Sequence, residues 1–122
     1  MSDTVDPGVK TTTPSGPAAF HYGAAHLIMH GNAAFLAVFG RRSLGMPARE
    51  VMTELPRAAF ELMDRVYREG RPLARRLALP DGEHRLVVVP RKDPETGETY
   101  GVTTHLRALD APTRRDSEAR RA

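Results

Sequence analysis

Residues 31–45 read GNAAFLAVFGRRSLG, and this stretch determines how the rest of the chain must be arranged. It predicts a short helix, because Asn32 can cap its start and Gly40 can end it in a left-handed turn. Phe35 and Phe39 are four residues apart and therefore share one face of that helix. Isolated helices shorter than about 12 residues are marginal in water, so this one must pack on a larger partner. Replacement of Phe39 by alanine is accordingly expected to cost roughly 3 to 5 kcal/mol.

The residues before this helix are predicted to form two short strands. The segments AAFHY (18–22) and HLIMH (26–30) flank a turn at residues 23–25. A helix over residues 24–30 is the alternative, because Ala, Leu and Met favour helices. In either case residues 18–30 form a short ordered segment before the helix that Asn32 caps.

The residues after the helix predict more helix and then strands. AREVM (48–52) favours one helical turn, and residues 56–69 have an apolar stripe at helical spacing. The period then changes to that of strands over residues 72–79, 84–91 and 99–109, with turns between them. Strands on both sides of a helical block predict an α+β domain whose sheet packs one face on the helices.

The ends of the chain differ in composition from this central part. Residues 1–17 are rich in Thr, Pro and Gly, which predicts a disordered leader, and residues 110–122 predict a charged, disordered tail. The ordered domain is therefore expected over residues 18–109. No segment resembles a signal peptide or reaches the roughly 18 apolar residues needed to span a bilayer. The chain has no cysteine, which favours a reducing compartment such as a bacterial cytoplasm.

The charge distribution argues against nucleic-acid binding. The chain has 18 Lys and Arg residues against 15 Asp and Glu residues, a net charge of +3. The two signs are interspersed along the sequence, whereas a nucleic-acid surface gathers basic residues on one stripe. We therefore expect neither a nucleic acid nor a membrane as partner.

The order of short motifs resembles that of a PAS domain over about residues 18–109. The residues that carry the resemblance are Asn32-x-Ala34-Phe35, Phe39-Gly40, Leu44-Gly45, Gly70, Asp81-Gly82 and Gly101-Val102. The resemblance implies a five-stranded antiparallel sheet in the order 2-1-5-4-3, with helices across one face and often a cavity for a small ligand. It also implies a sensory or protein-interaction module that is frequently a homodimer. Arg107-Ala108-Leu109-Asp110 departs from the family's Arg-Asp-apolar-Thr, which puts the usual relay into an effector in doubt.

A cavity of the kind that the resemblance implies would be lined by the apolar helix faces and by inward residues of the last three strands. These are Phe35, Phe39, Val51, Phe60, Met63, Val66, Leu77, Val87, Val89, Val102 and Thr104. The alternative is that the same side chains simply fill a core, because an empty apolar void costs about 24 cal/mol per Å³.

Arg75 is the candidate polar anchor for a ligand. Strand alternation places it on the same face as Leu73, Leu77 and Leu79, and a buried arginine needs an anionic partner. It could hold a ligand carboxylate or a gas bound to haem. The alternative is that its strand lies at the sheet edge and the side chain extends into solvent.

The histidines do not predict a metal or haem site. Haem-binding relatives commonly take their axial histidine from the long helix, and residues 56–69 contain none. His26 and His30 are expected at the surface, without a carboxylate at ligand spacing. The absence of cysteine excludes flavin photochemistry through a cysteinyl bond, and no catalytic motif is present, so an enzyme is not expected.

The sequence therefore leaves three hypotheses. The first is a cytoplasmic PAS-type sensory module that binds a small molecule and signals by homodimerisation or by docking to a signalling protein. The second is a ligand-free interaction module with a filled core, which uses the outer sheet face around His21, His26 and His105. The third is a haem sensor.

Overall fold

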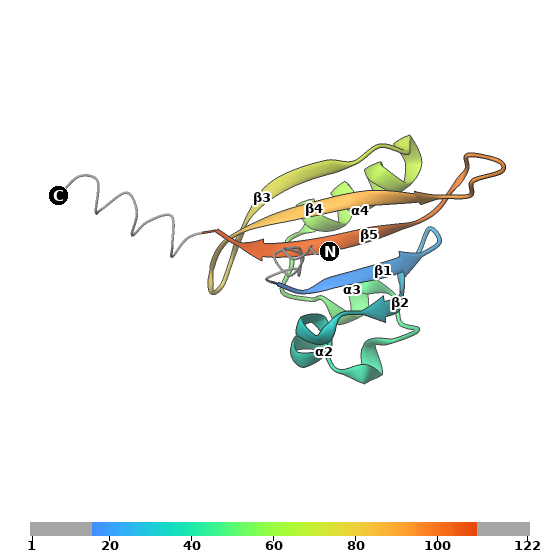
Figure 1. Ribbon diagram of the computed structural model, residues 1–122. Helices are drawn as coiled ribbons and strands as arrows, with labels where there is room; N and C mark the ends of the chain where they lie inside the picture. Colours follow the sequence, from blue (N-terminus) through green and yellow to red (C-terminus); the bar gives the residue numbers. More distant parts are fainter. Residues whose placement is uncertain (1–15, 110–122) are drawn as a thin grey trace, which may run out of the picture.

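The computed structural model describes residues 16–109, and their five strands form one antiparallel sheet (Figure 1). The order β2-β1-β5-β4-β3 confirms the expected topology. The strands are β1 (Ala18–Tyr22), β2 (Leu27–Gly31), β3 (Leu73–Leu79), β4 (Gly82–Lys92) and β5 (Thr99–Ala108). The predicted tail and nearly all of the predicted leader fall on residues 1–15 and 110–122, outside the described part.

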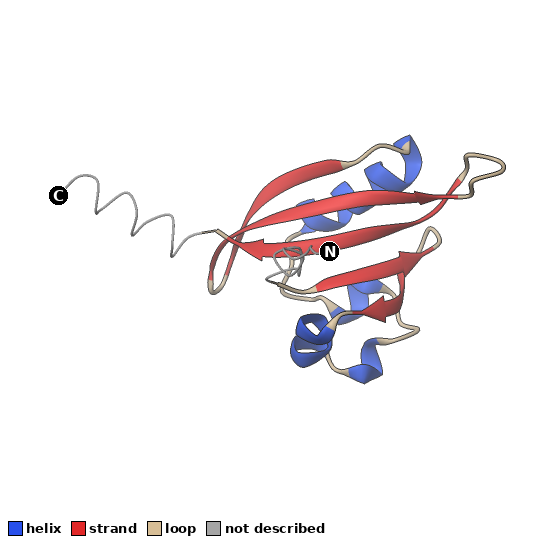
Figure 2. Cartoon of the chain, in the orientation of Figure 1, coloured by secondary structure: helices blue, strands red, loops and turns tan. Residues whose placement is uncertain are grey.

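Between β2 and β3 the chain forms all of its described helices. They are α2 (Ala33–Phe39), η1 (Arg41–Ser43), α3 (Ala48–Val51) and α4 (Arg57–Glu69). Figure 2 shows these helices on one side of the sheet, which leaves the other side uncovered by helices. The helical alternative for residues 24–30 is wrong, because Leu27 to Gly31 pair with β1. Within residues 16–109, no helix has the length and apolar character needed to cross a membrane.

The cap of α2 also attaches this helix to the sheet. The Asn32 side-chain oxygen accepts hydrogen bonds from the backbone N–H of Phe35 at 2.8 Å and of Ala18 at 3.0 Å. A single side chain therefore caps the helix and ties it to the start of β1. Gly31 allows the close approach, because a Cβ atom there would lie 2.6 Å from the Phe35 ring.

Helix α4 covers the half of the sheet formed by β5, β4 and β3 and supplies five of the buried core residues. Its buried residues contact β3, β4 and β5, and Gly70 ends it with φ 73° in the left-handed region. The buried side chains of this helix are Ala59, Phe60, Leu62, Met63 and Val66.

The expected inward positions of β4 are wrong. Leu86 and Val88 are buried, whereas Val89 is 40% exposed and Val87 lies on the same outer face. The pairing of Val88 with Thr104 sets this alternation, since directly paired residues share a face of the sheet. Three consecutive valines are equally apolar, so the sequence alone could not decide which of them points inward.

Candidate ligand-binding site

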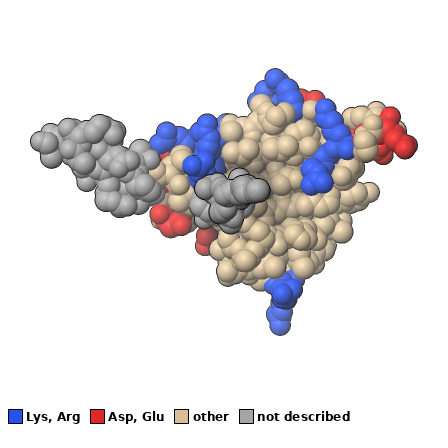
Figure 3. All heavy atoms as spheres, viewed as in Figure 1, with Lys and Arg blue, Asp and Glu red and all other residues tan. Residues whose placement is uncertain are grey.

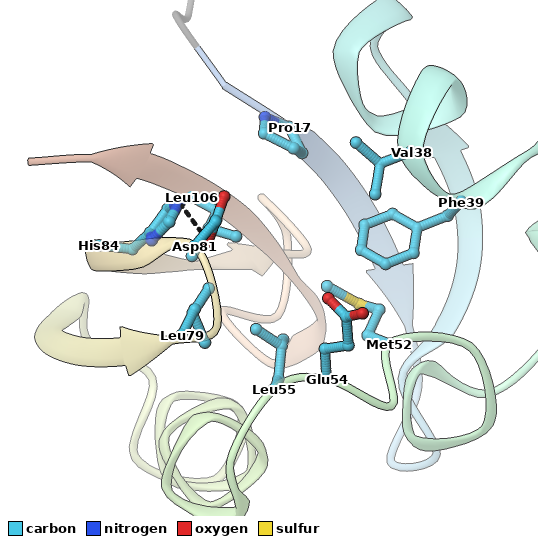
Figure 4. Close-up of a pocket in the computed structure, with 10 residues that line it drawn as sticks. All are labelled: Pro17, Val38, Phe39, Met52, Glu54, Leu55, Leu79, Asp81, His84 and Leu106. Atoms are coloured by element: carbon cyan, nitrogen blue, oxygen red, sulfur yellow. Dashed lines mark ion pairs between the residues drawn. The ribbon is translucent and has the colours of Figure 1, made fainter.

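A cavity of about 160 Å³ lies beside the end of the sheet where β3 turns into β4 (Figure 4). The end of α2 and the segment between α3 and α4 form its other walls. Its lining residues are Pro17, Val38, Phe39, Met52, Glu54, Leu55, Leu79, Asp81, His84 and Leu106. For scale, an engineered apolar cavity of about 150 Å³ binds benzene.

Most of the cavity wall is apolar. Phe39 comes from the last turn of α2, and its ring lies 4.6 Å from that of Phe35, measured between centroids. Met52 and Leu55 are buried residues of the α3–α4 connection, and Leu106 reaches the cavity from the central strand β5. Figure 4 shows these side chains around the same space. These side chains can contact an apolar ligand, but they offer it no hydrogen-bond partner.

The polar groups of the cavity are one histidine and two carboxylates. His84 Nδ1 lies 3.1 Å from the Gly82 carbonyl oxygen, and His84 Nε2 lies 3.8 Å from Asp81 Oδ1. The His84 side chain is 10% exposed and that of Asp81 is 78% exposed, so the histidine lies inside and the aspartate at the mouth. Glu54 belongs to the opposite side of the cavity in Figure 4. Among the described residues, no group of three or more His, Cys, Asp or Glu side chains could hold a metal ion.

Of the residues expected to line a cavity, the structure brings Phe39 to this one. Val51 is half-buried and borders a shallow recess that adjoins the cavity through Val38, Phe39 and Glu54. The other expected residues, apart from Val87 and Val89, are buried in the core; they are Phe35, Phe60, Met63, Val66, Leu77, Val102 and Thr104. The space is at the end of the sheet because the side chains at its centre meet those of α4.

Sequence reasoning missed the other residues of the cavity. Leu79 and Leu106 carry a usable signal, because they continue the alternation of Leu77 and Thr104 toward the strand ends. His84 likewise continues the alternation of Leu86 and Val88 in β4. Glu54 and Asp81 lie in connections, where no periodicity indicates which way a side chain points.

Arg75 does not reach the cavity and is not a ligand anchor there; the alternative of an exposed arginine on an edge strand is confirmed. Its pairing with Leu86 does place it on the helix side of the sheet. However, β3 is an edge strand, and Arg75 is exposed beside Glu61 and Arg65 of α4 in a separate shallow recess. The edge position lets a long side chain extend into solvent instead of crossing the core.

Three histidines, His21, His26 and His105, were expected on the outer face of the sheet, and this expectation is wrong for the first two. His21 is fully buried on the inner face, and His26 is 1% exposed. His21 Nε2 lies 2.8 Å from Thr104 Oγ1, and burial, together with nearby His26, lowers the pKa of His21 to about 4. His105 does belong to the outer face, where partial burial and then Arg107 lower its pKa.

His26 is tied to the helical layer. Its Nε2–H donates to Asp64 Oδ1 of α4 at 2.7 Å, and the second carboxylate oxygen accepts from Arg49 at 2.8 Å. The ring of His26 also meets that of Tyr67 edge to face at 6.0 Å. The backbone φ of His26 is 56°, a region that few non-glycine residues adopt. This contact holds the β1–β2 turn on α4.

The outer sheet face is instead marked by aromatic residues and valines. Tyr22 is 50% exposed, Tyr100 is 36% exposed, and the ring of Phe20 meets that of Tyr100 edge to face. The Arg91 guanidinium lies 5.3 Å from the centre of the Phe20 ring. In Figure 3 this face has a broad uncharged centre with Lys and Arg side chains gathered along its margin.

Solved structures provide the comparison with known proteins. No model of a protein family matches the sequence, and no curated protein matches it either. A sensory box sensor histidine kinase from Vibrio cholerae superposes with a TM-score of 0.67 at 15% identity, over 84% of this chain and 90% of that one. The PAS domain of histidine kinase ThkA gives 0.58 at 14% identity, over 74% of this chain and 97% of that domain.

The chain has the PAS fold. The Vibrio cholerae VqmA dimer, in a structure without its target DNA, gives a TM-score of 0.60 at 17% identity. That match covers 89% of this chain and 54% of VqmA. At these identities the similarity shows the fold alone, because one fold can serve many functions. Any ligand of this chain must be inferred from the residues of this chain.

Proposed function

We propose that this PAS domain is a non-enzymatic sensory module that binds a small, largely apolar molecule in the cavity beside His84. The observation that carries the proposal is the cavity itself, about 160 Å³ in volume and lined mainly by apolar side chains. Concave apolar sites with a few convergent polar groups are the usual form of a small-molecule site. The sensory kinases that share the fold support a role in signalling.

The proposed output is docking of a second copy or of a signalling protein on the outer sheet face. Leu106 lines the cavity, while its neighbours His105 and Arg107 lie on the opposite face of the same strand. Occupancy of the cavity can therefore bias the position of a strand whose other face contacts the partner. Protein cores respond to added volume by shifting the elements around it, so a bound ligand can displace β5.

A two-step experiment tests ligand binding. Native mass spectrometry and absorbance of protein purified from rich medium would reveal a retained ligand. Saturation-transfer NMR with ethylbenzene as probe would then test the cavity directly. We expect binding to the wild type and its loss in Leu79→Phe, which adds volume to the wall. Leu44→Phe is the matched control, because Leu44 is 40% exposed and does not line the cavity. Absence of ethylbenzene binding to the folded wild type would refute the proposal.

A ligand-free docking module is the second candidate, and the exposed aromatic residues of the outer face favour it. Large exposed apolar patches commonly mark interaction sites. Val89→Asp should then abolish self-association in sedimentation experiments, even when no cavity probe binds. Dimerisation that survives this substitution would argue against the outer face as the contact.

A further inference from the structure

The β3–β4 turn gives the cavity one polar corner, formed by His84 and Asp81. A carbonyl oxygen can only accept, so the contact between His84 Nδ1 and the Gly82 oxygen requires the proton on Nδ1. In the neutral ring Nε2 is then an acceptor. The His84 side chain is nine-tenths buried, and its Nε2 has no hydrogen-bond partner among the described residues.

The facing atom of Asp81 is an acceptor too. Its Oδ1 lies 3.8 Å from His84 Nε2, which is longer than a hydrogen bond. A donor placed beside two acceptors at this separation can bind both of them. An ammonium group has three N–H donors and can satisfy both atoms.

The charge of the cavity wall favours a cation as well. The ten lining residues include Asp81 and Glu54 but no lysine or arginine. A pocket of one sign attracts ligands of the opposite sign and disfavours those of its own. A carboxylate ligand is therefore disfavoured in this cavity, and Arg75, the candidate anchor for one, lies in a different recess.

We propose, building on the ligand-binding function above, that the cavity selects a small primary amine with an apolar body. The ammonium group lies between His84 Nε2 and Asp81 Oδ1. The apolar body, about the size of one six-membered ring, packs against Phe39, Leu55 and Leu106. Glu54 adds to the negative potential from the other side.

Three probes of one shape separate this proposal from simple apolar binding. Phenethylamine, phenethyl alcohol and phenylacetate share a ring and a short chain but carry a cation, a neutral hydroxyl and an anion. Titration calorimetry at neutral pH should give phenethylamine about threefold to fivefold tighter binding than the alcohol, the range of a partly exposed ion pair. Phenylacetate should bind most weakly.

Two variants locate the effect. Asp81→Asn should remove the advantage of the amine over the alcohol while changing alcohol binding by less than about twofold. Glu95→Asn, a change of similar chemistry in the β4–β5 turn, should leave all three affinities as in the wild type. Thermal melts would establish that both variants fold, as the exposure of Asp81 predicts.

The outcomes distinguish this inference from the proposed function. Equal binding of amine and alcohol to the wild type overturns amine selection and leaves the apolar cavity standing. An amine advantage that persists in Asp81→Asn overturns the role of the polar corner. A protonated His84 that pairs with Asp81 itself would instead give equal binding of amine and alcohol in the wild type, which also overturns amine selection. Failure of ethylbenzene and of all three probes overturns both proposals together.

Discussion

Two turns of the sheet each place a histidine near an aspartate. The pair at the first turn is in direct contact and is called closed, whereas the pair at the second turn is separated by a gap and is called open. At the β1–β2 turn, His26 and Asp64 are 2.7 Å apart, with side chains 2% and 39% exposed. At the β3–β4 turn, His84 and Asp81 are 3.8 Å apart, with side chains 10% and 78% exposed. The first pair joins segments 38 residues apart, whereas the second lies within one hairpin.

This difference separates a structural contact from a candidate site. The closed pair attaches a turn to α4, so its loss should appear in the stability of the fold. The open pair borders a cavity, so its loss should appear in ligand binding. Helix α2 connects the core with the cavity, since Phe35 is buried beside Gly31 of β2 and Phe39 lines the cavity.

The largest expected effect is in the core, at the buried Phe35 of α2. Phe35→Ala should lower the free energy of unfolding by about 3 to 5 kcal/mol, because Phe35 is 1% exposed and the site cannot collapse fully. Urea denaturation followed by circular dichroism measures the change. Val38→Ala on the same helix is the control and should cost less than about 0.5 kcal/mol, since Val38 is 64% exposed. A loss below about 1 kcal/mol for Phe35→Ala would mean that α2 is not packed as described.

The histidine pair provides the next test. His26→Ala should cost about 3 kcal/mol, because it removes a hydrogen bond to a carboxylate and leaves a void. His84→Ala should cost about 1 kcal/mol, since it loses a single hydrogen bond to the Gly82 carbonyl. Chemical denaturation of both variants measures the two losses. Equal losses would contradict the distinction between a closed and an open pair.

Acid should lower the free energy of unfolding, because two histidines are harder to protonate in the folded chain than in the unfolded one. The pKa of His21 is lowered to about 4 from an ordinary 6.5, so between these values the unfolded chain binds the proton that the folded chain excludes. Stability is therefore fully present above about pH 6.5 and falls as the pH drops toward 4, by about 2 kcal/mol between about pH 7 and about pH 5. His105, whose pKa is also lowered, acts in the same direction. Denaturant midpoints across this pH range should show the decline, and His21→Asn should flatten it.

Phe39 should matter less to stability than Phe35. Phe39→Ala is now expected to cost about 1 to 2 kcal/mol, because the ring is half-buried and already borders open space. The same variant should weaken ethylbenzene binding by enlarging the cavity and removing a contact. A loss as large as that of Phe35→Ala would show that the cavity is closed in solution.

The smallest effect is expected at the open pair. Asp81→Asn should change the free energy of unfolding by less than about 0.5 kcal/mol, since the side chain is 78% exposed. Asp64→Asn, which weakens contacts with both His26 and Arg49, should cost about 1 kcal/mol. Thermal melts at neutral pH show which of the two variants loses more stability.

The order and bounds of the elements followed from local sequence. Asn32, Gly40 and Gly70 delimit helices through capping and backbone preferences that act over a few residues, and changes of period mark the strands. These signals are local, so one sequence carries them without further information. The sheet order, in contrast, was implied by the resemblance to PAS domains that the motifs of residues 31–45 and the later turns carry.

The inward or outward direction of particular side chains was decided by tertiary structure. The face of Val87 and Val89 depends on pairing with β5, and the burial of His26 depends on an aspartate 38 residues away. The cavity forms where segments distant in sequence meet, from Phe39 of α2 to His84 of β4 and Leu106 of β5. Local patterns state which residues are apolar or polar, but only the packing of the whole chain determines which surfaces meet and where space remains.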